Sequence, residues 1–461
     1  MSVDVVPFQR HLAEKYDRPG PRYTSYPTAP HFQDAYDAHD YLRAVSKSHR
    51  HHARPLSVYI HVPFCESLCY YCACSKIITH NRERASEYLD YLKREIVLQA
   101  ALFDENRELS QLHLGGGTPT FLSNDQLAEL VDALSSAFHF SAPETREFSL
   151  EVDPRTVSTE QISQLRELGF NRVSFGVQDF DERVQRAVNR VQSEAQVTAL
   201  MASAREAGFA SVSVDLIYGL PLQTIDSFAT TLEKVIALRP DRIAAYSYAH
   251  LPSLFKAQRL IRNEDMPPPE RKLELLELTI SRLTQAGYVY IGMDHFALPE
   301  DELSLARQDG TLQRNFQGYS TRAECDMIGL GVTAIGRMAD AYSQNVKTTA
   351  EYMKCLDAGE LPVLRGYVLS AEDHLRADVI TAVMCHGQVD FSAIEKRHDI
   401  IFREHFSAAL EALEEMQDDG LVTIDAQYLR VLPSGRLMLR NVAMAFDAYL
   451  GEGAGRYSRT V

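Results

Sequence analysis

The stretch that decides the fold is VYIHVPFCESLCYYCAC, residues 58–74. Four of the chain's seven cysteines lie in it: Cys65, Cys69, Cys72 and Cys74. The first three have the spacing C-x3-C-x2-C, and the apolar run 56–60 just before the loop predicts a buried strand. Thiols this close together oxidise readily and their thiolates repel one another. Such a cluster therefore indicates a metal site rather than a packing role.

The kind of metal site follows from the number of ligands. A structural zinc site needs four ligands, typically two well-separated pairs, and the sequence has no second C-x2-C pair. An iron–sulfur cube can bind three cysteines and leave its fourth iron open for a substrate or cofactor. We therefore predict one 4Fe-4S cluster on Cys65, Cys69 and Cys72. A zinc knuckle and a disulfide are the alternatives, and Cys74 would strain the loop if it closed the cube.

Composition disfavours some classes of function. The 461 residues are 45% apolar, and 47 Lys and Arg stand against 63 Asp and Glu, a net charge of -16. That balance disfavours a nucleic-acid partner, which requires a basic face, although local arginines can still bind a small anion. No apolar run approaches the roughly 20 residues that span a bilayer, and residues 1–20 contain no signal-peptide core. We expect no membrane span and a cytoplasmic location.

Apolar runs alternate with amphipathic stretches of helical period through the first two-thirds of the chain. The apolar runs predict strands at 56–61, 111–114, 147–152, 172–177, 211–217 and 242–248. The amphipathic stretches predict helices at 86–103, 123–138, 158–168, 193–207 and 224–238. This repetition predicts parallel strands with right-handed crossovers, in an α/β fold. Six units fit a partial (β/α)6 barrel, with a doubly wound open sheet as the alternative.

The flanking segments divide the chain into an N-terminal arm (1–50), a catalytic domain (51–361) and a C-terminal domain (362–461). Prolines between residues 19 and 30 indicate an irregular arm. Helical stretches at 371–386 and 403–417, followed by a hairpin turning at 425–427, predict a small, mostly helical, winged-helix-like domain. Acidic residues at 411–419 argue against DNA binding, and we expect this domain to cover the barrel mouth.

Polar and glycine residues follow the predicted strands at one edge, where either architecture places its functional site. They are Gly115, Gly116, Gly117, Thr118, Glu151, Gln178, Asp215 and Ala249. Glycines allow a ligand to approach the backbone closely, and carboxylates accept hydrogen bonds from hydroxyl or ammonium groups. A tight turn and ordinary strand-end hydrogen bonds are the structural alternatives. Convergence of several strands on one rim favours a binding site.

The cysteine motif, with Tyr71 before the third cysteine, resembles the radical S-adenosylmethionine (SAM) superfamily. A wider set resembles the oxygen-independent coproporphyrinogen III oxidase family: GPRYTSYPT at 20–28, GGGTPT at 115–120, EVDP at 151–154, GVQDF at 176–180 and GMDHF at 292–296. The resemblance covers nearly the whole chain and favours the partial (β/α)6 radical-SAM barrel. It implies that the open iron binds SAM, whose reductive cleavage yields a 5′-deoxyadenosyl radical.

The resemblance also implies site residues. Around the SAM on the cluster it implies Tyr59, Gly116, Glu151 and Ile335. Around a second SAM it implies Tyr71, Gly117, Thr118, Gln178, Arg190, Asp215 and Ala249. Arg22 and Tyr23 are candidates to meet a substrate carboxylate. Cys74 either supports the cluster loop or acts on the substrate, and His61 is either catalytic or a packed histidine.

The implied reaction is anaerobic oxidative decarboxylation of two propionates of coproporphyrinogen III to vinyl groups, giving protoporphyrinogen IX in haem biosynthesis. Each event consumes one SAM, so two SAM molecules and one cluster are expected as cofactors. A porphyrinogen substrate and a reducing electron-transfer protein are the expected partners of a monomer. The rivals are a haem-binding radical-SAM carrier, which generally lacks the GPRYTSYPT arm and the fourth cysteine, and a non-enzymatic zinc protein.

Overall fold

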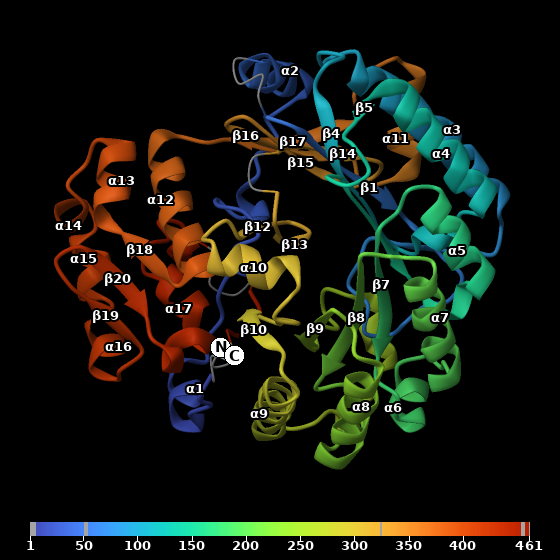
Figure 1. Cartoon of the computed structure of the whole chain (residues 1–461). Helices are drawn as coiled ribbons and strands as arrows, with labels where there is room; N and C mark the ends of the chain where they lie inside the picture. The colour runs from blue at the N-terminus through green and yellow to red at the C-terminus, as the bar shows by residue number, and fades with distance from the viewer. Residues whose placement is uncertain (1–5, 50–53, 323–324, 453–456, 461) are drawn as a thin grey trace.

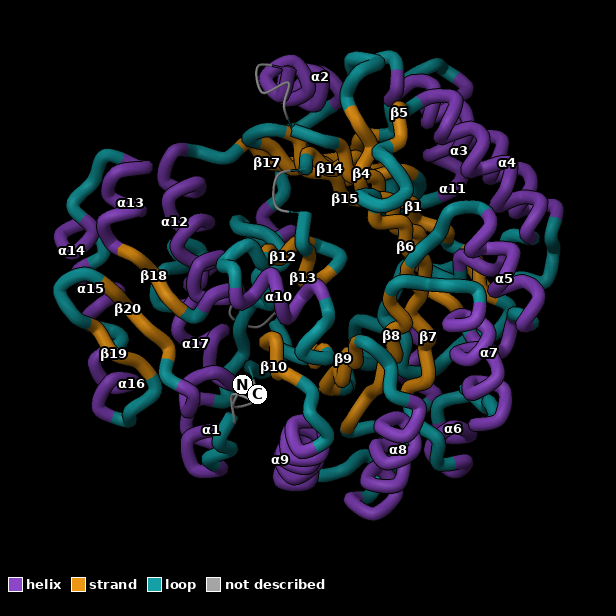
Figure 2. The backbone as a smooth tube through the Cα atoms, in the orientation of Figure 1, coloured by secondary structure: helices purple, strands orange, loops and turns teal. Residues whose placement is uncertain are grey.

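The computed structural model describes residues 6–49, 54–322, 325–452 and 457–460. Its centre is an arc of parallel strands at the predicted positions: β1(Leu56–Val62), β4(Glu108–Gly116), β6(Glu147–Val152), β7(Arg172–Gln178), β8(Ser211–Tyr218) and β9(Arg242–Ser247). The connecting helices cover the outer face (Figures 1 and 2): α3(Glu83–Ala100), α4(Asn124–Ala137), α5(Thr159–Glu167), α7(Glu194–Glu206), α8(Ile225–Leu238) and α9(Pro269–Gln285). The order β9-β8-β7-β6-β4-β1 is the partial (β/α)6 arrangement, in an open sheet.

Sequence patterns explain where these helices begin. Ser123 accepts from the Gln126 backbone N–H at 3.2 Å, while the Gln126 side chain accepts from the Ser123 N–H at 3.0 Å. Ser158 and Gln161 form the same reciprocal pair. Each pair satisfies two backbone donors that a helix end leaves open. The capping boxes predicted for α4 and α5 are therefore confirmed.

The sheet extends beyond the six units at both edges and has thirteen strands in the described residues. Beyond β1 come β14(Asp326–Leu330), β15(Ile335–Met338), β16(Ala341–Asn345) and β17(Val363–Val368). Beyond β9 come β11(His295–Ala297) and β10(Val289–Gly292), and β5(His139–Phe140) pairs with β4. Because β17 pairs with β16, the main sheet continues past residue 362, where the C-terminal domain was expected to begin.

The remaining elements are short. The α-helices are α1(Arg10–Tyr16), α2(Ala38–Ser48), α6(Glu182–Ala187), α10(Glu302–Gln308) and α11(Thr349–Asp357), and the strands are β2(Phe64–Cys65), β3(Ile77–Ile78), β12(Gln313–Asn315) and β13(Gly318–Ser320). The 3-10 turns are η1(Ala29–His31), η3(Pro119–Phe121), η4(Pro154–Thr156), η5(Lys256–Leu260), η6(Asn263–Asp265), η8(Pro433–Met438) and η9(Leu450–Glu452). The expectation of an irregular arm is wrong for α1 and α2, which flank its proline-containing segment.

The C-terminal unit is mostly helical. It contains α12(Ala371–Thr381), the π-helical turn η7(Ala382–His386), α13(Phe391–His398), α14(Phe402–His405), α15(Ser407–Glu411), α16(Glu414–Asp418) and α17(Leu439–Met444). The helix expected at 403–417 is therefore three short helices. The hairpin is present as β19(Val422–Ile424) and β20(Tyr428–Val431), and β18(Gln388–Asp390) adds a third strand. Leu12 and Tyr16 of α1 pack into the core of this unit.

The two chain ends lie side by side (Figure 1). The Gly20 N–H donates to the Ser458 carbonyl at 3.0 Å, and the Thr460 N–H donates to the Arg18 carbonyl at 2.8 Å. The buried guanidinium of Arg440 joins both segments by donating to the carbonyls of Gly20, Pro21, Ser458 and Arg459. We call these two segments, 18–22 and 457–460, the terminal strap.

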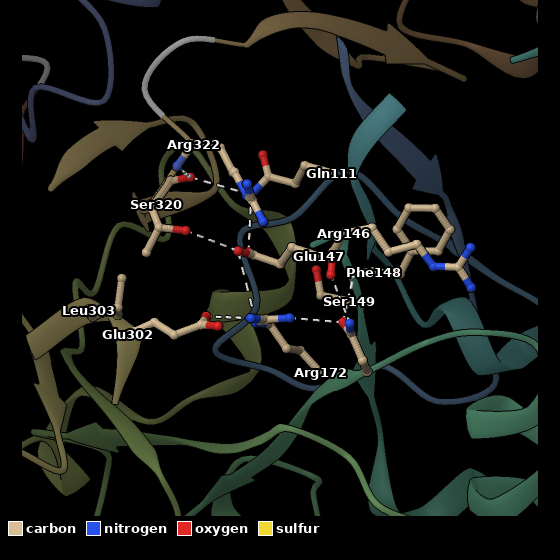
Figure 3. Close-up of polar contacts among 12 residues, drawn as sticks. Gln111, Arg146, Glu147, Phe148, Ser149, Arg172, Glu302, Leu303, Ser320 and Arg322 are labelled. Carbon is tan, nitrogen blue, oxygen red and sulfur yellow. Dashed lines mark hydrogen bonds and ion pairs between the residues drawn. The ribbon is translucent and has the colours of Figure 1, made fainter. Parts of the chain in front are cut away.

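A buried polar network closes the amino ends of the central strands (Figure 3). Glu147, which begins β6, accepts from Gln111 Nε2 of β4 at 3.1 Å and from Thr321 Oγ1 at 3.2 Å. Arg172, which begins β7, lies with its Nε 3.9 Å from Glu147 Oε2 and also pairs with Glu302 of α10. Although burial opposes ionisation, the guanidinium of Arg172 helps to lower the pKa of Glu147. The network thus connects the amino ends of β6 and β7 to the segment 301–322.

We predict that Glu147→Ala lowers the free energy of unfolding by about 2–5 kcal/mol, because the Gln111 amide and the Thr321 hydroxyl each lose a buried acceptor and Arg172 loses its buried carboxylate neighbour. Glu302→Ala is the matched control. Its carboxylate is 51% exposed and pairs with the same arginine, so the expected loss is below about 1 kcal/mol. Urea unfolding of both variants measures the difference, and equal losses would contradict the account. Because the pKa of Glu147 is lowered, its contribution is present above the ordinary carboxyl pKa and is lost as the pH falls.

Candidate active site

The cysteine loop leaves the carboxyl end of β1 and is held there by backbone hydrogen bonds. The short parallel strands β2 and β3 close the loop. The Ile77 N–H donates to the Pro63 carbonyl at 2.7 Å, and the Thr79 N–H donates to the Cys65 carbonyl at 3.0 Å. The Tyr70 N–H donates to the Val188 carbonyl at 3.0 Å, beyond the end of β7. The loop is thus fixed over the strand ends, where the sequence places its glycines and polar residues.

Side chains from three later segments reach the sulfurs of this loop. Thr118 Oγ1 donates to Cys65 Sγ at 3.4 Å. Arg155 Nη2 and Arg190 Nη1 donate to Cys69 Sγ at 3.4 and 3.5 Å. Hydrogen bonds to ligand sulfurs are a standard means of stabilising thiolates and tuning an iron–sulfur cluster. Arg155 directly follows the EVDP motif at 151–154, and its contact with the cysteine loop was not predicted.

The state and spacing of the cysteines distinguish an iron–sulfur cluster from its alternatives. A hydrogen bond from Cys74 lowers the pKa of Cys72 to about 6, which favours its thiolate, whereas burial raises the pKa of Cys65 to about 11, which favours its thiol. All seven cysteines are free thiols, so the disulfide alternative is not realised. Within the described segments, no three His, Cys, Asp or Glu side chains converge as the ligands of a single ion would. A cube, whose cysteines bind different irons, accommodates this spacing better than a zinc knuckle.

Cys74 has a different environment from the other three cysteines. It is exposed, whereas Cys69 is buried and Cys65 and Cys72 are half-buried. The Lys76 ammonium donates to the carbonyls of Cys72 and Cys74, at 2.9 and 3.4 Å, which fixes the loop between them. The Cys74 thiol is therefore exposed beside the cluster loop, where it also donates a hydrogen bond to the Cys72 sulfur.

The glycine triplet brings β4 against the cysteine loop. The Gly117 N–H donates to the Val62 carbonyl at 2.8 Å, and the Thr118 N–H donates to the Phe64 carbonyl at 2.8 Å. A Cβ on Gly117 would lie 2.8 Å from Phe64 O and from the Pro63 carbonyl carbon. Only glycine permits this approach of two backbones. Gly117 is therefore a structural requirement of the loop and not merely part of a flexible turn.

Residues predicted for the first SAM surround this junction. The Gly116 N–H donates to Glu151 Oε2 at 3.4 Å, and a Cβ on Gly116 would lie 2.6 Å from the His61 ring. His61 Nε2 donates to the Ser75 carbonyl at 3.0 Å, so its Nδ1 accepts from the Tyr59 hydroxyl at 3.2 Å. Burial lowers the pKa of His61, which keeps the ring neutral. Both ring nitrogens are therefore occupied by neighbours.

Ile335 lies on the other side of β1 from these residues. Gly329 of β14 is the register partner of Tyr59, and a Cβ on Gly329 would lie 2.7 Å from the Ile335 carbonyl carbon. The backbones of β14 and β15 are therefore in close contact beside Tyr59. The structure thus places Glu151, Gly116, Tyr59 and Ile335 on neighbouring strands, in the order β6, β4, β1 and, beyond β14, β15. That these four residues bind SAM stays a prediction.

The residues predicted for a second SAM continue along the rim. Gln178 has φ +69°, and its Oε1 is buried without a hydrogen-bond partner among the described residues. Asp215 accepts from Ser174 Oγ at 3.1 Å, and burial, together with Glu151, raises its pKa to about 7. These side chains can meet hydroxyl or amine donors of a bound ligand. Arg190, by contrast, is already bonded to Asp153 at 3.1 Å.

Tyr71 and Ala249 are linked by a residue that the sequence did not single out. The buried Gln258 donates through Nε2 to the Tyr71 carbonyl at 3.1 Å and to the Ala249 carbonyl at 3.2 Å. It comes from η5, beyond the last strand of the predicted barrel. No motif marks it, because a single glutamine in a loop carries no spacing signal.

A cavity of about 650 Å³ adjoins Ala249. Its walls include Tyr218 and Ser247 at the ends of β8 and β9, Lys272 of α9, and both segments of the terminal strap. Arg22 lines it and is ion-paired with Asp294, whereas the Tyr23 hydroxyl donates to Asp447 at 2.9 Å within the C-terminal core. The structure thus places Arg22 at the cavity and directs Tyr23 away from it.

Comparisons with known proteins agree with this geometry. Family models described as "Radical SAM superfamily" and "HemN C-terminal domain" match residues 59–235 and 369–438. Oxygen-independent coproporphyrinogen III oxidases of Escherichia coli (strain K12) and Pseudomonas aeruginosa are each 46% identical, over 100% of both chains. The solved structure of coproporphyrinogen III oxidase (HemN) from Escherichia coli matches with a TM-score of 0.92 at 45% identity, covering 97% of this chain and 100% of that one. The chain therefore belongs to the oxygen-independent coproporphyrinogen III oxidase family of radical SAM enzymes.

Proposed function

We propose that this enzyme converts two propionates of coproporphyrinogen III to vinyl groups without oxygen, giving protoporphyrinogen IX in haem biosynthesis. Each conversion removes one hydrogen atom from the carbon next to the macrocycle, releases CO2 and passes one electron to an external acceptor. The observation that carries the proposal is the three-cysteine loop fixed beside a cavity that contains cationic residues. This combination occurs in a chain 46% identical over its full length to named oxidases.

The cluster and the first SAM have defined partners in the proposal. Cys65, Cys69 and Cys72 hold the 4Fe-4S cluster, and a SAM bound at its open iron supplies the 5′-deoxyadenosyl radical on reduction. Tyr59, Gly116, Glu151 and Ile335 bind that SAM. His61, whose ring nitrogens are both bonded, supports Gly116 and is not the acid or base that the sequence left open.

A second SAM is proposed further along the rim. Its residues are Tyr71, Gly117, Thr118, Gln178, Arg190, Asp215 and Ala249. The Gln178 side-chain oxygen, which has no partner among the described residues, and the Asp215 carboxyl, whose pKa is about 7, provide acceptor and donor groups near pH 7. Because Arg190 also donates to Cys69 and Asp153, it would position the cysteine loop as well as contact the ligand.

For the substrate we propose Arg22 as a carboxylate-binding residue that exchanges Asp294 for a propionate. Tyr23, buried on Asp447, positions that segment. Cys74, exposed beside the loop, is the proposed catalytic thiol. The proposal further includes a reducing electron-transfer protein, a monomeric enzyme and a cytoplasmic location. Among the helices in the described part of the chain, none has the length and hydropathy that a bilayer span requires.

The direct test is anaerobic turnover of the reconstituted enzyme with reductant, SAM and coproporphyrinogen III. We expect vinyl products, with one 5′-deoxyadenosine and one CO2 for each propionate lost. SAM cleavage without any change in the tetrapyrrole would reject the proposed substrate.

Arg22→Met should raise the substrate KM about 10-fold or more while the variant still cleaves SAM, since a charge-assisted hydrogen bond to the substrate is lost.

We predict that Gly117→Ala greatly reduces iron and sulfide incorporation, because its Cβ would displace the backbone at Pro63 and Phe64. Gly115→Ala is the control from the same triplet. The Cβ there would meet side-chain atoms of Glu151 and His113 at 3.1–3.2 Å, and these can move. Iron and sulfide analysis after anaerobic reconstitution measures both variants. Full cluster content in Gly117→Ala would contradict the structural role assigned to Gly117.

A further inference from the structure

Lys272 projects from the first turn of α9 into the cavity beside Ala249. Its ammonium donates to the Tyr248 carbonyl at 2.8 Å, just past the end of β9. The side chain therefore extends from the outer helix to the rim formed by the strand ends. The residue whose carbonyl it contacts, Tyr248, directly precedes Ala249, which is proposed to bind SAM.

The lysine stem occupies a groove made by a glycine. Gly219, directly after β8, has φ +80°, a conformation that favours glycine. A Cβ there would lie 2.8 Å from Lys272 Cε and 3.2 Å from its Cγ. Any other residue at 219 would displace the lysine stem. The backbone of β8 and the side chain of α9 thus fit each other and fix the ammonium at one place.

The other cations around the cavity are engaged. Arg22 pairs with Asp294 and Arg459 with Asp17. Arg436 donates to the Ile291 carbonyl at 3.2 Å, and Arg440 donates to carbonyls of the terminal strap. Lys272 forms no salt bridge with any residue in the described segments, and its one hydrogen bond leaves two of its three protons for a ligand.

The electrostatics of this position favour an anion. Burial lowers the pKa of Lys272, while the more distant Asp17 raises it and Arg459 lowers it. A carboxylate in the cavity would restore the lost solvation of the ammonium. Tyr218, Tyr290, Met266 and Leu273 line the same cavity, so an apolar body carrying a carboxylate matches its chemistry.

We propose that Lys272 binds a propionate carboxylate of the tetrapyrrole substrate, holding the macrocycle in the cavity beside Ala249. The inference rests on the proposed function and adds a named substrate-binding residue. A SAM carboxylate has the same ligand chemistry, so the test separates the two sources.

The test uses the cluster-loaded enzyme under anaerobic conditions. Coproporphyrin III, the stable oxidised relative with the same four propionates, is titrated by fluorescence, and SAM binding is measured separately by equilibrium dialysis. The variants are Lys272→Met and, as the control, Lys256→Met, which removes an exposed charge outside the cavity. If Lys272→Met does not fold, Lys272→Gln replaces it.

Lys272→Met should weaken coproporphyrin III binding roughly 10-fold or more and leave SAM binding and iron content unchanged. Lys256→Met should alter neither. Unchanged porphyrin binding in Lys272→Met, or weakened SAM binding instead, would overturn the inference. A wild-type enzyme that neither binds coproporphyrin III nor converts coproporphyrinogen III would reject the proposed function itself. Wild-type turnover together with an unaffected variant rejects Lys272 alone.

Discussion

The close contact between Gly117 and the backbone at Pro63 and Phe64 is the constraint on which the site depends. Two hydrogen bonds of 2.8 Å, from the amides of Gly117 and Thr118, join the ends of β4 and β1 at this point. The cysteine loop begins there, so its position over the strand ends is set by backbone geometry. A loop held by its own side chains alone would leave the three sulfurs poorly placed for one cluster.

Residues from later loops and 3-10 turns then complete the site around that fixed loop. Arg155 and Arg190 approach Cys69, while Gln258 joins Tyr71 to Ala249. The cavity beyond Ala249 is closed by segments from both ends of the chain, which Arg440 holds together. The structure thus combines a cysteine loop fixed by backbone hydrogen bonds with a cavity whose walls come from both ends of the chain.

Periodicity and motifs predicted a large part of this structure. The six parallel strands, the capping boxes, the family and its cluster and SAM cofactors are confirmed. The helices α1 and α2 were missed because the prolines between residues 19 and 30 predict irregular structure, and this prediction was extended to the whole arm, including the proline-free stretches on either side. The β14–β17 extension was missed because glycine and polar residues interrupt the apolar residues of its strands. Gln258 and Lys272 act through contacts that only the folded chain creates, so no sequence spacing could reveal them.

The most direct measurement is electron paramagnetic resonance of the reduced, reconstituted enzyme with and without SAM, for wild type and Cys74→Ser. If Cys65, Cys69 and Cys72 hold a cluster with one open iron, SAM should change the g values of the 4Fe-4S signal. Cys74→Ser should retain both the signal and the change. A 4Fe-4S signal whose g values are the same with and without SAM, or loss of the cluster in Cys74→Ser, would contradict the account.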